Sequence, residues 1–83
     1  MRTNYEIGEV VRIREWDDMA TAYPERDCDD AIMVGAGVTH KMKPLCGTDV
    51  TIVDKYTDEE GTFYKVKDDK TVYEFDFSAE MFE

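Results

Sequence analysis

Residues 48–67 decide the fold, and they read TDVTIVDKYTDEEGTFYKVK. Apolar and polar side chains alternate on both sides of the turn-forming run at residues 58–61, which is the period of a β-strand with one buried face. The pattern predicts one strand over residues 48–54 and a second over residues 62–67. The side chains predicted to face inward are Val50, Ile52, Tyr64 and Val66.

A third strand is predicted over residues 71–77, after a tight connection at Asp68 and Asp69. Its aromatic side chains share one face and would pair with those of the preceding strand across a hairpin. They are Tyr73, Phe75 and Phe77. Ser78 then caps a final turn over residues 79–82, whose apolar side chains would plug one end of the sheet.

The N-terminal part begins with another strand, from Gly8. Val11 and Ile13 face one way, and three residues face the other: Val10, Arg12 and Arg14. The period then changes to that of a short helix, which ends at Pro24. Its apolar stripe is Trp16, Met19, Ala20 and Tyr23, with Asp17 and Asp18 at its start.

The middle of the chain is less regular. Residues 24–30 read as an exposed acidic loop, and residues 31–34 as a short strand broken by the Gly-Ala-Gly run at residues 35–37. Thr39 is the expected N-cap of a single helical turn that includes Met42 and Leu45, with Gly47 as its exit.

The order of these elements predicts the fold class. We expect a single domain over residues 1–83, mainly β with short helices, in which the sheet closes so that no strand edge stays open. The expected architecture is a small SH3-like barrel in which residues 15–47 form an enlarged first loop. Because a chain of 83 residues has a thin core, a homo-oligomer would be a natural way to bury more surface.

Three stretches of the sequence carry a family resemblance: Gly8-x-x-Val11-Arg12-Ile13-Arg14-x-Trp16-Asp17-Asp18-Met19, Leu45-Cys46-Gly47 and Tyr73-x-Phe75-x-Phe77-Ser78-x-x-Met81. They resemble a family of short uncharacterised proteins encoded by phages and prophages of Gram-positive bacteria. More loosely, they are similar to the SH3-type barrels of the Mind-bomb/Herc class, from which the loop between Trp16 and Thr48 departs. The phage resemblance implies a small accessory protein, a class that includes counter-defence factors, and it names no ligand.

The charge of the chain restricts its partners. Twenty acidic and ten basic residues give a net charge of −10, so direct binding to a nucleic-acid backbone, which needs Lys and Arg, is not expected. Basic protein surfaces would be attracted instead, although the charge could serve solubility alone. Residues 1–6 hold no apolar run and no stretch approaches the length of a membrane span. We therefore expect a protein of the host cytoplasm that does not contact a membrane, with reduced cysteines.

Catalysis is not expected. The chain has one histidine, His40, and one serine, Ser78, and neither sits in a nucleophile motif. The dense acidic runs fall in polar loops, where a solvated carboxylate is a poor general acid. The run at residues 35–37 lacks the lysine of a phosphate-binding loop.

Metal and cofactor binding are not expected either. Cys28, His40 and Cys46 are three soft ligands, but structural zinc normally uses closer cysteine pairs. The acidic loop at residues 27–30 lacks the oxygen spacing of a calcium loop.

The scarce basic residues define the candidate ligand site. Arg12 and Arg14 share the outward face of the first strand, Trp16 follows them, and the one-turn helix carries His40, Lys41 and Lys43. Cations beside flat aromatic rings can hold a small anionic, ring-bearing ligand such as a nucleotide. The alternative is that the arginines form cross-strand ion pairs with neighbouring acids and that Trp16 belongs to the core.

These features lead to one expected function and two alternatives. The expected function is a non-catalytic, phage-encoded binding protein that sequesters a host immune component, either a host protein or a small nucleotide signal. The first alternative is an acidic mimic of nucleic acid that inhibits a nuclease or CRISPR effector, with the carboxylates of residues 27–30, 58–60 and 68–69 on one surface. The second is a structural or assembly protein of the virion.

Overall fold

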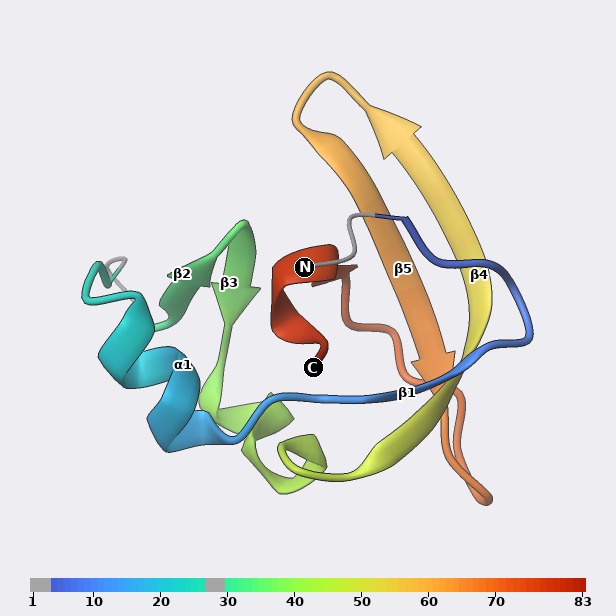
Figure 1. Ribbon diagram of the computed structural model, residues 1–83, viewed down its shortest axis with the longest axis horizontal. Coiled ribbons are helices and arrows are strands. Elements are labelled where there is room, and N and C mark those ends of the chain that lie inside the picture. Colours follow the sequence, from blue (N-terminus) through green and yellow to red (C-terminus); the bar gives the residue numbers. More distant parts are fainter. Residues whose placement is uncertain (1–3, 27–29) are drawn as a thin grey trace.

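The computed structural model describes residues 4–26 and 30–83, and a curled four-stranded antiparallel sheet forms its main layer (Figure 1). The strand order is β1-β4-β5-β6. The strands are β1 (Val10–Arg12), β4 (Asp49–Asp58), β5 (Gly61–Lys67) and β6 (Phe77–Ser78).

The β4–β5 hairpin confirms the prediction from residues 48–67 and is longer than expected, because β4 continues to Asp58. The side chains predicted to face inward are each no more than 2% exposed: Val50, Ile52, Tyr64 and Val66. The register shifts between Ile52 and Asp54. Such a bulge increases local twist, which helps to curl the sheet around its apolar face.

The predicted strand over residues 71–77 is wrong for most of its length. Val72 bridges to Lys67, and Phe77 pairs with Tyr64. The five residue steps from Val72 to Phe77 therefore lie opposite only three residue steps of β5, from Lys67 to Tyr64. Two residues too many separate the two contacts, so the intervening segment arches out of the ladder and only β6 remains as a strand.

The C-terminus turns back onto β1 and closes part of the sheet. A short 3₁₀ helix, η2 (Ala79–Met81), follows β6, and Phe82 then forms a bridge with Ile13. The Arg14 N–H donates to the Met81 carbonyl at 2.9 Å, and the Glu83 N–H donates to the Arg12 carbonyl at 2.8 Å. The mainly β fold is confirmed, and these pairings are compatible with a small SH3-like barrel with an enlarged first loop.

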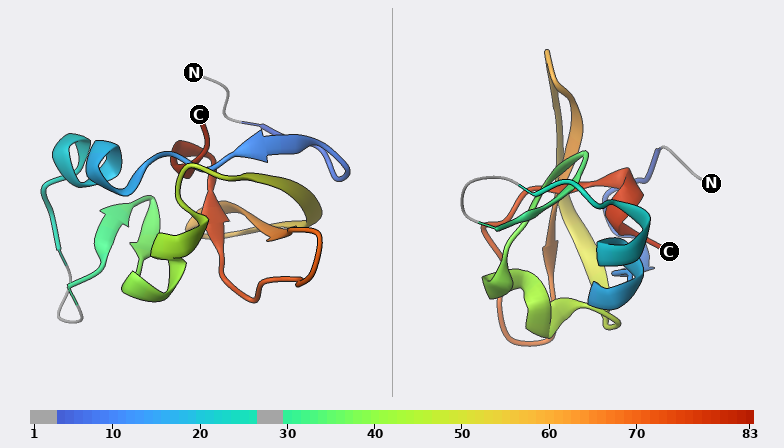
Figure 2. Two further views of the ribbon diagram at one scale, coloured as in Figure 1. Left: turned by 90° about the horizontal axis from the view of Figure 1, so that it is seen from below. Right: turned by 90° about the vertical axis from the view of Figure 1, so that its left-hand side faces the viewer.

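That loop holds a helix, a small hairpin and a 3₁₀ helix, which lie together beside the sheet (Figure 2). They are α1 (Trp16–Ala22), β2 (Ile32–Val34), β3 (Ala36–Val38) and η1 (His40–Leu45). The predicted helix before Pro24 is confirmed. The expected break at residues 35–37 is confined to Gly35, whose φ is +75°, because its two successors already pair in β3.

The helical turn after Thr39 forms as predicted, although η1 spans six residues. The Thr39 N–H donates to Met42 Sδ at 3.4 Å, and the Met42 N–H donates to the Thr39 carbonyl at 3.0 Å. Gly47 follows with a φ of +78°, the left-handed conformation that glycine adopts most easily at a helix exit.

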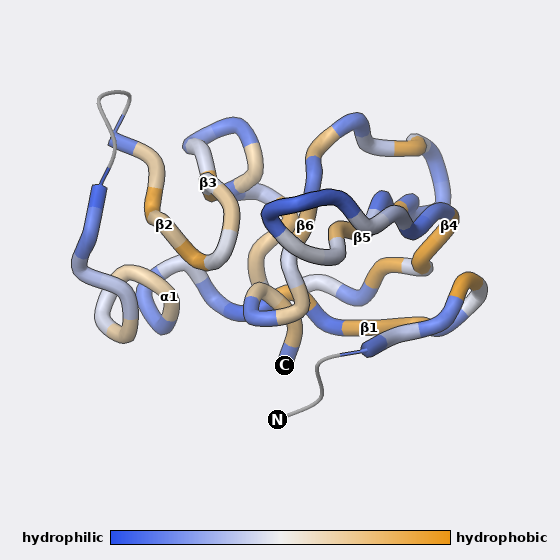
Figure 3. Tube along the Cα trace, turned by 90° about the horizontal axis from the view of Figure 1, so that it is seen from above, coloured by the Kyte–Doolittle hydropathy of each residue, from blue (hydrophilic) through white to orange (hydrophobic). Residues whose placement is uncertain are grey.

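The core lies between the curled sheet and the elements of the first loop, and hydrophobic stretches of β1 and β2 contribute to it (Figure 3). Met19 of α1 and Met81 of η2 are both fully buried. Ser78 does not cap η2 with its side chain as predicted; its hydroxyl donates to the Val34 carbonyl instead and so joins β6 to β2. In the described part of the chain, no helix is long and apolar enough to cross a membrane.

Candidate functional site

Three of the predicted ligand-binding residues come together on one surface. The imidazole of His40 lies 5.0 Å from the Trp16 ring, centroid to centroid, with 30° between the two planes. The ammonium of Lys43 lies 5.4 Å from the centre of the Trp16 ring. We refer to these three side chains as the aromatic–cationic cluster.

The backbone of the barrel positions this cluster. The Gly47 N–H donates to the Ile13 carbonyl at 2.8 Å, and the Ile13 N–H donates to the Thr48 carbonyl at 3.0 Å. These two bonds hold the end of η1 beside the chain that enters α1. Trp16 and His40 are the first residues of those two helices, so they meet although 24 positions separate them in the sequence.

The cluster is accessible from outside. Trp16 is half-buried against the core, and the His40 side chain is 63% exposed. The His40 Nε2 atom lies 3.6 Å from Asp30 Oδ2, so one edge of the imidazole faces a carboxylate. Lys41 is exposed, and it makes no hydrogen bond, ion pair or ring contact with the residues that the structure describes.

The two arginines are held elsewhere. Arg12 Nε donates to Asp49 Oδ1 at 3.0 Å across the β1–β4 pair. Arg14 Nε donates to Asp18 Oδ2 at 2.7 Å, and its guanidinium lies 5.6 Å from the centre of the Tyr23 ring. Arg12 thus forms the cross-strand ion pair of the alternative interpretation, and Arg14 ties β1 to α1.

Cys46 lies next to Lys43 of the cluster as a free, half-buried thiol. Burial, and next the charge of Glu15, raise the pKa of the Cys46 thiol, while Lys43 lowers it by less. A thiol that stays protonated is a poor nucleophile and a poor metal ligand. Within residues 4–26 and 30–83, no three His, Cys, Asp or Glu side chains lie close enough together to hold a metal ion. Cys28 lies outside the described residues.

The two acidic runs that lie fully within the described residues do not share one surface. Residues 58–60 lie at the tip of the β4–β5 hairpin, and residues 68–69 lie at the opposite end of that hairpin (Figure 1). Most of the run at residues 27–30 lies outside the described residues; Asp30 itself is near His40. The nucleic-acid mimic of the first alternative gains no support from this arrangement.

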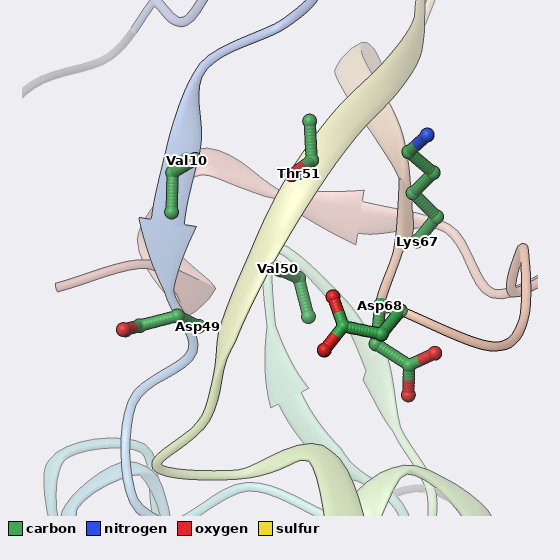
Figure 4. Close-up of a pocket in the computed structure, with 7 residues that line it drawn as sticks. Val10, Asp49, Val50, Thr51, Lys67 and Asp68 are labelled. Atoms are coloured by element: carbon green, nitrogen blue, oxygen red, sulfur yellow. The ribbon is translucent and has the colours of Figure 1, made fainter.

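The structure also shows a hollow that the sequence did not predict (Figure 4). It has a volume of about 600 Å³ and lies against β1, β4 and the end of β5. Its lining residues are Val10, Asp49, Val50, Thr51, Lys67, Asp68 and Asp69. The outward position of Val10 was the one sequence signal that pointed to this face.

The aromatic–cationic cluster has the chemistry of a binding surface. The imidazole and the indole are in contact at a tilt of 30° and present two neighbouring aromatic rings, and Lys43 adds a positive charge beside the indole. No protein-family model, curated protein or solved structure matches this chain. The function is therefore inferred from the geometry of the chain's own residues.

Proposed function

We propose that this protein acts by binding rather than by catalysis, and that the aromatic–cationic cluster takes a small anionic ligand with a flat ring, such as a nucleotide. The observation that carries the proposal is the contact of Trp16 with both His40 and Lys43. This contact gives a ring to stack on and a cation to meet a phosphate at one place.

The stacking partner of the ligand would be His40. Its imidazole contacts the Trp16 ring at a tilt of 30°, while the side chain as a whole is 63% exposed. A ligand ring can therefore add to the outer face of the imidazole without unfolding any element. Base–aromatic stacking is worth about 1–3 kcal/mol per ring. With an exposed ion pair of about 0.2–1 kcal/mol, the two contacts correspond to an affinity of about 1 mM at best.

Lys43, the cation at the Trp16 ring, would meet the anionic group. It lies on η1, as Lys41 does, and the structure describes no carboxylate paired with either lysine. The net charge of −10 repels an anion at long range, but salt at about 0.15 M screens exposed charges beyond roughly 8 Å. At that ionic strength the nearby ammonium groups, and not the net charge of the chain, determine whether an anion binds.

The biological form of the proposal is sequestration of a host signal nucleotide in the cytoplasm. This step rests on the resemblance to phage-encoded proteins. A host protein as the partner would need a different surface, because the cluster presents cations within a chain that is acidic elsewhere.

The test is a titration that follows the fluorescence of Trp16, the single tryptophan of the chain, with calorimetry in parallel. The probes are ADP-ribose, AMP and a cyclic dinucleotide at about 0.15 M salt, the ionic strength of the screening argument. We expect Lys43→Gln to weaken binding by roughly 1.5- to 5-fold, the range of an exposed ion pair converted to affinity.

Lys41→Gln is the matched control, because it removes the same charge from the same helix without touching the Trp16 ring. Equal weakening by both variants would show general charge attraction and not a site at Trp16. The absence of heat and of any fluorescence change with all three probes would refute the proposal.

A further inference from the structure

The chain before β1 forms a strap over the apolar face of the β4–β5 hairpin. The strap is residues 4–7, which lie outside the strands and pass over β5 and β4 (Figure 1). Tyr5 is the one buried residue of the strap, at 3% exposure, and its three neighbours there are exposed. The buried contact of the strap with the barrel is therefore made by a single side chain.

The floor beneath Tyr5 is aromatic. The Tyr5 ring lies 5.8 Å from the Tyr64 ring, centroid to centroid, with 89° between the planes. It lies 5.2 Å from the Phe82 ring, with 80° between the planes. Both are edge-to-face contacts, an arrangement that aromatic pairs prefer. The Tyr5 N–H also donates to the Tyr64 hydroxyl at 3.1 Å, so the floor offers an aromatic ring both its packing surface and a hydrogen-bond acceptor for the backbone beside it.

The rim of the floor carries a positive charge. Lys55 of β4 lies directly opposite Tyr64 and therefore shares its face of the sheet. The Lys55 ammonium donates to the side-chain oxygen of Asn4 and lies 4.0 Å from Glu6 Oε1. In the described part of the chain these two strap residues are the only partners of the ammonium. Without the strap, an unpaired cation would therefore stand at the rim and favour an acidic residue.

The strap can leave while the sheet stays paired. The Gly8 N–H donates to the Ile52 carbonyl at 2.8 Å, and the Ile52 N–H donates to the Glu9 carbonyl at 2.9 Å. These bonds hold the chain to β4 from Gly8 onward, so β1 keeps its partners when the residues before it move. A Cβ atom built on Gly8 would meet no atom within 4 Å. The open space around Gly8 makes it the hinge of the strap.

We propose that the strap is the internal ligand of a peptide-binding site, and that an extended segment of a partner protein binds there in its place. The segment has an aromatic residue followed by an acidic residue, as Tyr5 and Glu6 are in the strap. Its ring would stand edge-on to Tyr64 and Phe82, its N–H would meet the Tyr64 hydroxyl, and its carboxylate would meet Lys55. The three contacts correspond to a dissociation constant of about 0.1 mM at best, and closed strap molecules weaken the apparent affinity further.

The contacts of the strap select this occupant. A basic residue after the aromatic one would bring a second cation to Lys55, and an aliphatic side chain would lose the edge-to-face contacts. A second copy of the chain would only exchange one strap for an identical one, and each copy carries a net charge of −10. The site shares no residue with the aromatic–cationic cluster, so the two proposals are tested separately.

The first measurement is amide hydrogen exchange of the parent chain, followed by NMR. The Tyr5 N–H is compared with the Ile13 N–H, which is bonded to the Thr48 carbonyl inside the barrel. If the strap opens while the barrel stays folded, the protection factor of the Tyr5 amide should be at least about tenfold lower than that of the Ile13 amide. Because this measurement needs no variant, it decides even if the variant below does not fold.

The second measurement uses the ¹⁵N-labelled full chain with Tyr5→Ala, which empties the site. The probe is an acetylated and amidated peptide with the sequence of residues 4–7, and two control peptides carry serine for the tyrosine or glutamine for the glutamate. We expect shift changes at residues 55, 64 and 82, and at least about tenfold weaker binding of the serine peptide, because it buries no ring.

Lys55 supplies the control for charge. The glutamine peptide should bind about 1.5- to 5-fold more weakly than the probe, the range of an exposed ion pair converted to affinity. When Lys55→Gln is added to Tyr5→Ala, the two peptides should bind equally.

Four results would overturn the proposal. The first is equal protection of the Tyr5 and Ile13 amides, which would show that the strap leaves only when the whole fold opens. The second is an absence of shift changes with the probe at about 10 mM, a hundred times the best dissociation constant expected. The third is equal binding of the probe and the serine peptide. The fourth is a parent chain that sediments as a dimer and becomes monomeric in Tyr5→Ala, which would show that the occupant is the strap of a second copy.

Discussion

Replacing Gly35 by alanine tests how the first loop is joined to the barrel. Gly35 has a φ of +75° and forms the whole turn between β2 and β3. A Cβ atom built on it would lie 2.7 Å from Glu80 Oε2, which can turn away, and also 2.8 Å from Ser78 Oγ and 2.9 Å from Ser78 Cβ. Ser78 is 3% exposed and its hydroxyl is bonded to the Val34 carbonyl, so it has little room to move.

Gly47 supplies the matched control. Its φ of +78° is nearly the same, but the nearest atoms to an added Cβ belong to the carboxylate of Glu15. That side chain is exposed and can turn away. Gly47→Ala should therefore cost only the left-handed backbone conformation, about 1–2 kcal/mol.

Gly35→Ala should cost the same backbone strain and, in addition, an overpacking penalty of about 1–3 kcal/mol. The total of about 2–5 kcal/mol is a large part of the stability of a domain of this size, about 4–12 kcal/mol. In a thermal melt, Gly35→Ala should unfold at least about 4 °C below Gly47→Ala.

The assay is urea and thermal unfolding followed by circular dichroism, with both variants measured against the parent chain. A loss of stability that is equal in the two variants would refute the reasoning. It would mean that Ser78 yields as easily as Glu15, and that β6 and the β2–β3 turn do not pack as tightly as the distances indicate.

Three further predictions follow from the contacts of individual side chains. Arg14→Gln should destabilise the protein by at least about 1 kcal/mol more than Arg12→Gln in urea unfolding, because the Arg14 side chain is 17% exposed and the Arg12 side chain 52%; equal losses would contradict this. The hydrogen bond from Tyr73, followed by those from two backbone N–H groups, holds the pKa of Asp68 below its usual value. The ionised carboxylate should therefore stabilise the fold above about pH 4. This stability should be lost as the pH falls through the lowered pKa of the folded state. In Tyr73→Phe the pKa of Asp68, measured by NMR titration, should rise. Ile52→Val should cost about 0.5–1.5 kcal/mol, since the side chain is fully buried, and a neutral result in urea unfolding would show that the core can relax around the lost methylene.

The sequence by itself determined the elements whose hydrophobic period is unbroken. The alternation around Val50 and Tyr64 predicted the central hairpin, and the helical spacing of Trp16 and Met19 predicted α1. The candidate site was predictable only as a set of residue types, because a list of six side chains does not say which of them meet.

Tertiary contacts decided the rest, since they depend on where distant segments are brought together. Residues 73–76 have the alternation of a strand, but they form none because the segment is two residues too long to pair continuously with β5. The bonds between Ile13 and the exit from η1 brought His40 to Trp16, while Asp49 and Asp18 took the two arginines. The hollow exists because β1 and the loop after β5, more than fifty residues apart in the chain, lie on the two sides of β4.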